Sequence, residues 1–265
     1  MNANTQAQIN RMKEQTIGVE VEMNNIPRKA AAKIAAEFFG TNRYEDTAFR
    51  NGYYTWSAWD AQGREWKFQR DVSISGPDSE KCEMVTPILH YEDIETLQEL
   101  IRRLRKAGAK SDYTRGCGVH IHIGAAGHTP QSLRNLANLM ASHESLIAEA
   151  IKVDSSRYHM LNLHATFTKG TIEFRLFQFD KPAGGKQNGL HAGKLKSYIQ
   201  LCLAMSQMAK DLRSASPKEQ QKENKKFAMR TWLMRMGFIG DEFATARETL
   251  TQNLTGDNAF RFGRP

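Results

Sequence analysis

Three stretches of the sequence carry ionisable residues two positions apart, with an apolar residue between them. These pairs are Glu20 and Glu22, His120 and His122, and Glu173 and Arg175. In a β-strand, residues two positions apart point to the same face and lie about 6.6–6.8 Å apart along the strand. If the three stretches belong to one sheet, a single face carries three carboxylates, two imidazoles and a guanidinium.

Such a face could bind metal ions. Carboxylates that lie close together repel one another unless cations lie between them, and Mg²⁺ takes carboxylate, water and phosphate oxygens as ligands. Each pair also has a simpler interpretation. Glu20 and Glu22 could lie on a solvent-exposed strand face, the histidines could be structural, and Glu173 with Arg175 could form a surface ion pair. The metal-site hypothesis therefore depends on the three pairs occurring together.

Hydrophobic periodicity predicts the elements that would position these residues. We expect strands over residues 16–23, 53–60, 64–70, 81–85, 119–124, 163–168 and 171–177. We expect helices over residues 28–39 and 91–108, from Thr129 onward, over 190–212, and twice more through Leu254, with a polar linker or exposed helix over 214–226. Strands come mostly before residue 180 and helices dominate the last third. This order predicts an α+β fold in which helices cover one face of a largely antiparallel sheet.

The motifs resemble those of glutamine synthetases. They are more similar to those of the amidoligases, the carboxylate–amine ligase branch of the glutamine synthetase and glutamate–cysteine ligase superfamily. Five segments follow the family's chain order: Gly18–Glu22 (G-x-E-x-E), Trp66–Ser73 (W-K, then D-x-S), Glu83–Pro87 (E-x-V-[ST]-P), Gly118–Gly124 (G-x-H-x-H-I-G) and Thr171–Arg175 (T-I-E-F-R). One spacing departs from the pattern, because Lys67 and Asp71 are one residue further apart than in the family. The resemblance extends over roughly residues 16–200.

This resemblance implies a glutamine-synthetase-like, curved and mostly antiparallel sheet with helices on its convex face. It implies an ATP- and Mg²⁺-dependent ligase that forms an amide bond between a carboxylate and an amine through an acyl phosphate. The implied ligands of two or three Mg²⁺ ions are Glu20, Glu22, Glu83, His120 and Glu173. Arg175, Glu173 and Asp71 would be catalytic, and His122, Lys67 and Arg175 would contact the nucleotide or substrates.

Two further segments near the last predicted strand remain open to interpretation. The glycine-rich stretch Ala183–Gly189 could close over phosphates with its backbone amides and Lys186, or could be a simple connection. Arg157 and Asn162 could line the same pocket or be structural. Cys117 lacks an orienting base nearby in the sequence, so we do not expect it to be a nucleophile.

Composition argues against several classes of protein. The chain is 40% hydrophobic and 25% charged, which is typical of a globular protein. The three cysteines form no CxxC pair, which argues against a disulfide scaffold or a zinc knuckle. We expect neither a secretory signal nor a membrane span, and therefore a cytoplasmic protein. The expected domains are a polar tail over residues 1–15, a catalytic domain over 16–213 and a helical extension packed on it over 214–265.

The chain is basic, with 37 lysines and arginines against 29 aspartates and glutamates, a net charge of +8. A basic surface attracts nucleotides, acidic substrates or nucleic acids without choosing among them. Two alternatives to the ligase therefore remain. One is a metal-dependent hydrolase or metal-binding module that uses the His/Glu cluster. The other is a basic nucleic-acid-binding protein, although no nucleic-acid motif is present. The ligase hypothesis implies small-molecule or peptide acids and amines as substrates.

Overall fold

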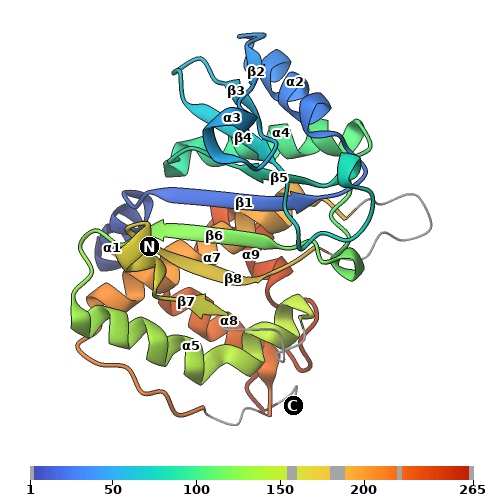
Figure 1. The fold of residues 1–265 in the computed structure, drawn as a ribbon. Coiled ribbons are helices and arrows are strands. Elements are labelled where there is room, and N and C mark those ends of the chain that lie inside the picture. The colour runs from blue at the N-terminus through green and yellow to red at the C-terminus, as the bar shows by residue number, and fades with distance from the viewer. Residues whose placement is uncertain (1–2, 154–159, 180–188, 220–222, 263–265) are drawn as a thin grey trace. The chain divides into compact units, whose positions relative to one another are not determined.

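The computed structural model describes residues 3–153, 160–179, 189–219 and 223–262 (Figure 1). Its helices are α1 (Ala3–Lys13), α2 (Arg28–Phe38), α3 (Ala48–Asn51), α4 (Ile94–Lys106), α5 (Pro130–Ile151), α6 (Ala165–Thr168), α7 (Ala192–Asp211), α8 (Lys225–Arg235) and α9 (Ala244–Thr249). Its strands are β1 (Ile17–Met23), β2 (Tyr44–Asp46), β3 (Trp56–Trp59), β4 (Glu65–Gln69), β5 (Cys82–Val85), β6 (Val119–Gly124), β7 (Leu161–Asn162) and β8 (Thr171–Phe177). The mixture of helices and antiparallel strands confirms the α+β prediction.

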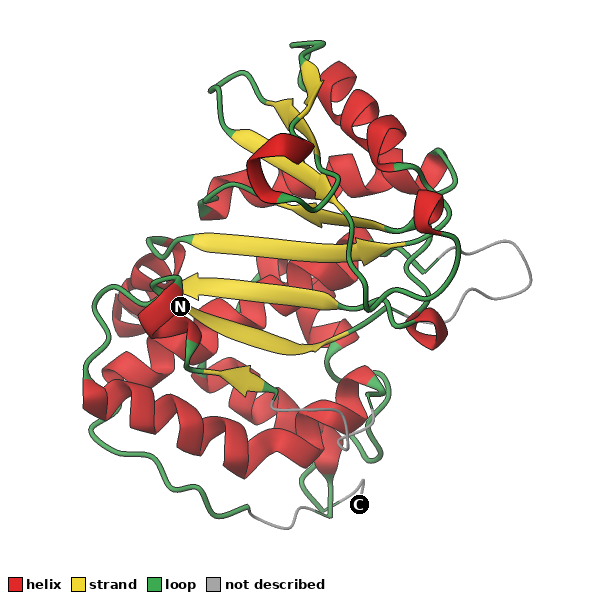
Figure 2. Cartoon of the chain, in the orientation of Figure 1, coloured by secondary structure: helices red, strands yellow, loops and turns green. Residues whose placement is uncertain are grey.

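The chain forms two compact units. The first unit contains residues 16–121 and 177–192, and the second contains residues 1–15, 122–176 and 193–265. Figure 2 shows that strands make up much of the first unit, whereas helices dominate the second. The domain boundaries expected at residues 15 and 213 stay predictions. Among the helices of the described residues, none combines the length and the apolar character needed to cross a bilayer.

The strands of the first unit follow the order β2-β3-β4-β5-β1, and each neighbouring pair is antiparallel. Directly opposite residues share a face, so the register identifies two rows of side chains across the sheet. One row runs from Ser57 through Lys67 and Val85 to Glu20, and the other from Gln69 through Glu83 to Glu22. These rows place the predicted site residues of three strands on one face.

The opposite face of this sheet is apolar and packs against α2 and α4. Val21, Met84 and Phe68 are fully buried there, and α2 contacts β3, β4 and α4. Helix α4 is amphipathic as predicted: Ile94, Leu97, Leu100, Ile101 and Leu104 are all buried. Figure 1 shows α4 behind β3 and β4 and α3 in front of them. One face of the sheet therefore packs against helices, and the other face carries the two rows with the ionisable side chains.

The β3–β4 hairpin is tied to the start of α4 by an arginine. Arg64 donates to Asp60 at 2.8 Å and makes two hydrogen bonds to Asp93, at 2.8 and 2.9 Å. Asp60 also accepts the indole N–H of the buried Trp66 at 3.0 Å. Arginine suits this position because its planar guanidinium can serve two carboxylates at once. The network fixes the hairpin that carries Lys67 and Gln69.

The second unit packs long helices against a short hairpin. Strand β7 pairs with β8, with Asn162 opposite Glu173. Helix α5 begins as predicted, with Thr129 capping and Pro130 in the first turn. The buried Asn135 of α5 donates to the carbonyls of Ala209 and Leu212, which end α7. The N-terminal residues expected as a polar tail form α1, whose Ile9 and Met12 are buried.

The strand predicted over residues 163–168 is wrong. Residues Ala165–Thr168 form the short helix α6 instead, and the pairing with β8 moves back to Leu161 and Asn162. The side chain of Asn162 accepts the backbone N–H of His164 at 3.0 Å, which starts a turn. Phe167 is 86% exposed, so its apolar character does not reflect a buried strand face.

We predict that Gly116 is essential for the loop before β6. Gly116 has a φ of 87°, and an added Cβ would lie 2.7 Å from the backbone oxygen of Ser73. Gly63 has a φ of 76° but no atom within 4 Å of such a Cβ. Gly63→Ala should therefore lower the free energy of unfolding by about 1–2 kcal/mol for the backbone alone, and Gly116→Ala by ~1–3 kcal/mol more because of the clash. Urea denaturation measures both, and equal losses would contradict the prediction.

Candidate metal and phosphate site

The first unit brings together five of the predicted site residues. Ligand atoms of Glu20, Glu83 and His120 lie within 4.8 Å of one another, and so do those of Glu22, Asp71 and Glu83. Glu83 belongs to both groups. The strand register explains this arrangement, because Glu83 lies directly opposite Glu22 and two positions away from Val85, the partner of Glu20. Two potential cation sites with one shared carboxylate are therefore built into the sheet.

Hydrogen bonds orient the carboxylates of these groups. His120 Nδ1 lies 3.1 Å from Glu20 Oε2, and the Gly118 backbone N–H donates to Glu22 Oε2 at 2.6 Å. The Gln69 amide donates to Glu83 Oε2 at 2.7 Å. Gln69 was not predicted from the sequence. Its position two residues after Lys67 on the same strand places it on the same face, and that spacing could have identified it.

Burial and mutual repulsion raise the affinity of this cluster for protons. Burial first, and then the negative charges of Glu20, Asp71 and Glu22, raise the pKa of Glu83 to about 7, although the hydrogen bond from Gln69 opposes them. Burial also raises the pKa of Glu22, an effect that His120 partly offsets. Divalent cations relieve such repulsion, and carboxylate oxygens are the ligands that Mg²⁺ prefers. The donor set therefore fits a hard divalent cation.

Lys67 faces the same side of the sheet as these carboxylates. It lies in the same row as Glu20, separated from it by Val85, and it is half-buried. Within residues 3–153 and the other described ranges, its ammonium has no hydrogen-bond or ion-pair partner. A half-buried lysine without a carboxylate partner can bind a carboxylate or phosphate of a ligand.

The second unit holds the remaining described residues that were predicted. Arg175 Nε lies 3.2 Å from Glu173 Oε1, and the Asn162 amide donates to Glu173 Oε2 at 2.7 Å. His122 Nδ1 lies 3.0 Å from the Thr171 hydroxyl, and its Nε2 lies 4.0 Å from Glu173 Oε1. Glu173 is buried, whereas the Arg175 side chain is 49% exposed. An exposed guanidinium held beside a buried carboxylate can contact an anionic ligand.

Two predicted residues lie outside the described ranges. They are Lys186, in the glycine-rich stretch, and Arg157. Cys117 is buried, and burial raises its pKa to about 12. A thiol with so high a pKa is protonated near neutral pH, so the structure agrees with the expectation that Cys117 is no nucleophile.

We predict that Glu83 makes the metal-free protein less stable at higher pH. Its folded pKa of about 7 exceeds the ordinary glutamate pKa of 4.5, so the folded state binds the proton more tightly than the unfolded state does. The contribution of Glu83 to the free energy of unfolding is therefore highest below about pH 4.5. It falls as the pH rises toward 7, and it levels off above pH 7. In EDTA at about pH 8, Glu83→Gln should raise the free energy of unfolding by on the order of 2 kcal/mol, and by much less at about pH 5.

Urea denaturation at the two pH values measures this difference. Glu95→Gln, at an exposed position of α4, is the matched control. Adding Mg²⁺ at pH 8 should stabilise the wild type more than the Glu83→Gln variant, because the cation needs the ionised carboxylate. The same pH dependence in the Glu83→Gln variant as in the wild type would contradict the prediction.

Comparisons with known proteins now identify the family. Among curated proteins, none matches the chain. Among solved structures, the chain is similar to a bifunctional glutathione synthetase from Pasteurella multocida, at 12% identity and a TM-score of 0.42. That alignment covers 95% of this chain and 49% of the other, so the chain spans about half the length of that enzyme. A similarity this weak carries no conclusion about fold or activity.

A family match covers more than half of the chain. Residues 13–157 match the family described as "Putative amidoligase enzyme". The match includes all members of both groups of candidate metal ligands in the first unit: Glu20, Glu22, Asp71, Glu83 and His120. It confirms the resemblance that the motifs indicated: the chain belongs to the amidoligase family.

Proposed function

We propose that the protein is an ATP- and Mg²⁺-dependent ligase that joins a carboxylate to an amine. The observation that carries this proposal is the sharing of Glu83 by two three-residue groups of candidate ligands, in a member of the amidoligase family. Ligases that consume ATP must bring polyphosphate and carboxylate anions together. Cations held on shared carboxylates are a common means of neutralising that charge.

We propose that these groups bind Mg²⁺. The candidate Mg²⁺ ligands are Glu20, Glu22, Glu83, His120 and Glu173, with Asp71 beside them. When bound, Mg²⁺ would withdraw charge from the phosphate oxygens. We also propose that the sheet has the curvature of the glutamine synthetase family.

The reaction proceeds in two displacements. A substrate carboxylate oxygen attacks the γ-phosphorus of ATP, the bond to the β,γ-bridging oxygen breaks, and ADP leaves with that electron pair. The amine nitrogen then attacks the acyl carbon, the bond to the phosphate oxygen breaks, and inorganic phosphate leaves while the nitrogen loses a proton to a base. No covalent enzyme intermediate is needed.

Side chains of this protein stabilise the charges in these steps. The Arg175 guanidinium neutralises the oxygens of the transferred phosphoryl group, where an arginine is most effective. Lys67 pairs with the carboxylate or phosphate of a bound ligand, and His122 contacts the nucleotide. Gln69 and Asn162 hold the second oxygens of Glu83 and Glu173, so that the other oxygens keep their direction.

The test is Mg²⁺-dependent release of ADP in the presence of amino acids, peptides and polyamines. Glu83→Ala in the first unit and Glu173→Ala in the second should each lower the rate by about 100-fold or more, because each removes a candidate ligand. Glu95→Ala, at an exposed position of α4, is the control and should keep the wild-type rate. Circular dichroism shows whether each variant folds.

Two results would count against the proposal. Retained ADP release in a folded Glu173→Ala variant would exclude Glu173 from the reaction. Tight binding of Zn²⁺ or Fe²⁺ without stabilisation by nucleotide would favour the metal-dependent hydrolase, since His120 with two glutamates can also bind transition metals. Metal analysis of the purified protein and nucleotide-dependent thermal unfolding separate these cases.

A further inference from the structure

Three large apolar side chains of the first unit lie on the surface. Phe49 in α3 is 82% exposed, Tyr54 just after α3 is 59% exposed, and Val72 in the loop after β4 is 75% exposed. We call these three residues the apolar rim. Single apolar residues on a surface need no explanation, but a group of them beside a polar site marks a place where a partner binds. The position of the rim relative to the candidate metal and phosphate site therefore matters.

Helix α3 lies over the ionisable face of β3 and β4, in front of these strands in Figure 1. Thr47 directly precedes the helix, and its hydroxyl lies 2.7 Å from the hydroxyl of Ser57. Ser57 is opposite Lys67 in the sheet, so both side chains point to this face. The start of α3 is therefore held over the row of side chains that contains Lys67.

An arginine of α3 connects the ring of Phe49 to strand β4. Arg50 Nη1 donates to Glu65 Oε1 at 3.3 Å, and its guanidinium carbon lies 5.5 Å from the centre of the Phe49 ring. Glu65 and Lys67 are two positions apart on β4 and share a face. Phe49 is therefore held near the beginning of β4, on the face that carries Lys67.

The other two rim residues lie at the end of β4. Arg70 directly follows this strand, and its backbone N–H donates to the carbonyl of Tyr53 at 2.9 Å. Its guanidinium carbon lies 5.7 Å from the centre of the Tyr54 ring. Val72 comes two residues later, directly after the candidate metal ligand Asp71. The rim therefore borders both ends of β4 and reaches the carboxylate cluster.

Tyr54 keeps its ring in place despite an uncommon backbone conformation. Its φ of 49° lies in the left-handed region, where bulky residues are rare. Arg28 holds this conformation, because its Nε donates to the carbonyl of Tyr54 at 3.0 Å and its Nη1 to the carbonyl of Lys81 at 2.8 Å. Residues in such conformations cluster at binding sites. Tyr54 is thus fixed before any ligand binds.

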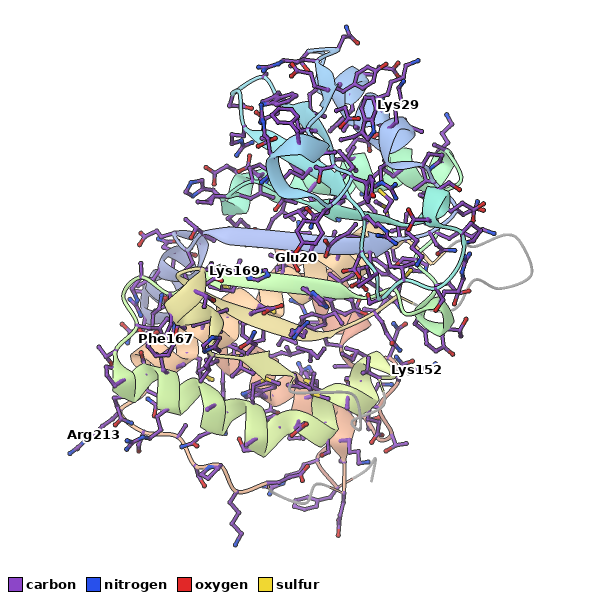
Figure 3. The ribbon with its side chains drawn as sticks, in the orientation of Figure 1. Glu20, Lys29, Lys152, Phe167, Lys169 and Arg213 are labelled. Atoms are coloured by element: carbon purple, nitrogen blue, oxygen red, sulfur yellow. The ribbon has the colours of Figure 1, made fainter. Side chains whose placement is uncertain are left out.

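Lys67 supplies a cation between the two ends of the rim. Its neighbour in the row across the sheet is the half-buried Val85, followed by Glu20 on β1, which is labelled in Figure 3. Within the described part of the chain, the ammonium of Lys67 has no hydrogen-bond or ion-pair partner. A cation surrounded by apolar side chains favours an anion that carries an apolar group.

We propose that the acid substrate is a peptide with apolar residues at its C-terminus. Its terminal carboxylate contacts Lys67, and its last side chains lie on Phe49, Tyr54 and Val72. A peptide suits the rim better than a small molecule does, because small molecules bind in concave cavities, whereas both aromatic rings are more than half exposed. This inference rests on the proposed function, since it names the acid that the ligase activates.

Fluorescence anisotropy with Mg²⁺ and without nucleotide tests the proposal apart from the reaction. Three probes carry a fluorophore at the N-terminus: Gly-Gly-Leu-Phe with a free carboxylate, the same peptide with a C-terminal amide, and Gly-Gly-Ser-Ser with a free carboxylate. We expect the first probe to bind at least about tenfold more tightly than either of the others, because the charge and the apolar contacts both contribute.

Substitutions separate the two contributions. Lys67→Met should weaken the binding of the Gly-Gly-Leu-Phe acid by about tenfold and leave that of the amide unchanged. Phe49→Ser and Tyr54→Asn should each weaken the binding of the Gly-Gly-Leu-Phe acid by about fivefold and leave that of Gly-Gly-Ser-Ser unchanged. Asparagine tolerates the left-handed backbone of Tyr54, so this variant keeps the loop conformation. Circular dichroism shows whether each variant folds.

Two variants are matched controls. Phe262→Ser removes an 88% exposed aromatic ring from the second unit. Lys33→Met removes an exposed cation from α2, the helix that packs on the opposite face of the sheet. Each should leave the affinity for the Gly-Gly-Leu-Phe acid within about twofold of the wild type.

Three results would overturn the proposal. Equal affinity for the Gly-Gly-Leu-Phe acid and its amide would show that the carboxylate makes no contact. Equal affinity for Gly-Gly-Leu-Phe and Gly-Gly-Ser-Ser would show that the rim makes none. An equal loss of affinity in Phe49→Ser and Phe262→Ser would show that the rim has no special role among exposed rings.

ADP release measured with the same peptides, without the fluorophore, distinguishes this inference from the ligase proposal. The expected binding pattern without peptide-dependent ADP release would support the peptide site and count against the ligase. ADP release with free amino acids, by a protein that binds none of the peptides, would support the ligase and overturn the peptide site.

Discussion

The repulsion among four carboxylates on one sheet face is the constraint on which the first unit depends. Glu20, Glu22, Asp71 and Glu83 lie within two groups that share a member, and burial makes their charges harder to screen. Single donors at Gly118, Gln69 and His120 orient three of the carboxylates but do not neutralise them. Burial, together with this repulsion, raises the pKa of Glu83. Such a cluster is tolerated because the other face of the same strands is packed with buried apolar side chains.

Because side chains alternate along a strand, β1 contributes both to the apolar core and to the carboxylate cluster. In β1, Val19 and Val21 enter the core while Glu20 and Glu22 face the ionisable side. A slip of one residue in the register would exchange the two sets, so core packing also fixes the positions of the carboxylates. The affinity of the cluster for cations is thus linked to the stability of the sheet. Neutralising one of these carboxylates should raise the free energy of unfolding. A bound cation should also raise it, while the carboxylates stay ionised.

Much of this arrangement could be predicted from the sequence, because it depends on local periodicity and short motifs. The alternation in β1, the apolar stripe of α4 and the proline after Thr129 all identify their elements within a few residues. Pairings between distant segments could not be predicted in this way. The contact of Gln69 with Glu83 depends on the register of two strands. Helix α6 replaces a predicted strand because a turn, closed by the side chain of Asn162, overrides the weak alternation of apolar and polar residues there.

The N-terminal helix α1 has a consequence for the order in which the chain can fold. Gln15 donates to the carbonyl of Leu203, and Arg11 pairs with Asp211. Lys13 bonds to Glu242, a contact across 229 positions of sequence. Residues 11–15 therefore acquire these native neighbours only after residues 203–242 have been synthesised. Long-range closure of this kind slows folding and leaves apolar side chains such as Met12 exposed meanwhile. During synthesis, α1 is accordingly a segment that chaperones would be expected to bind.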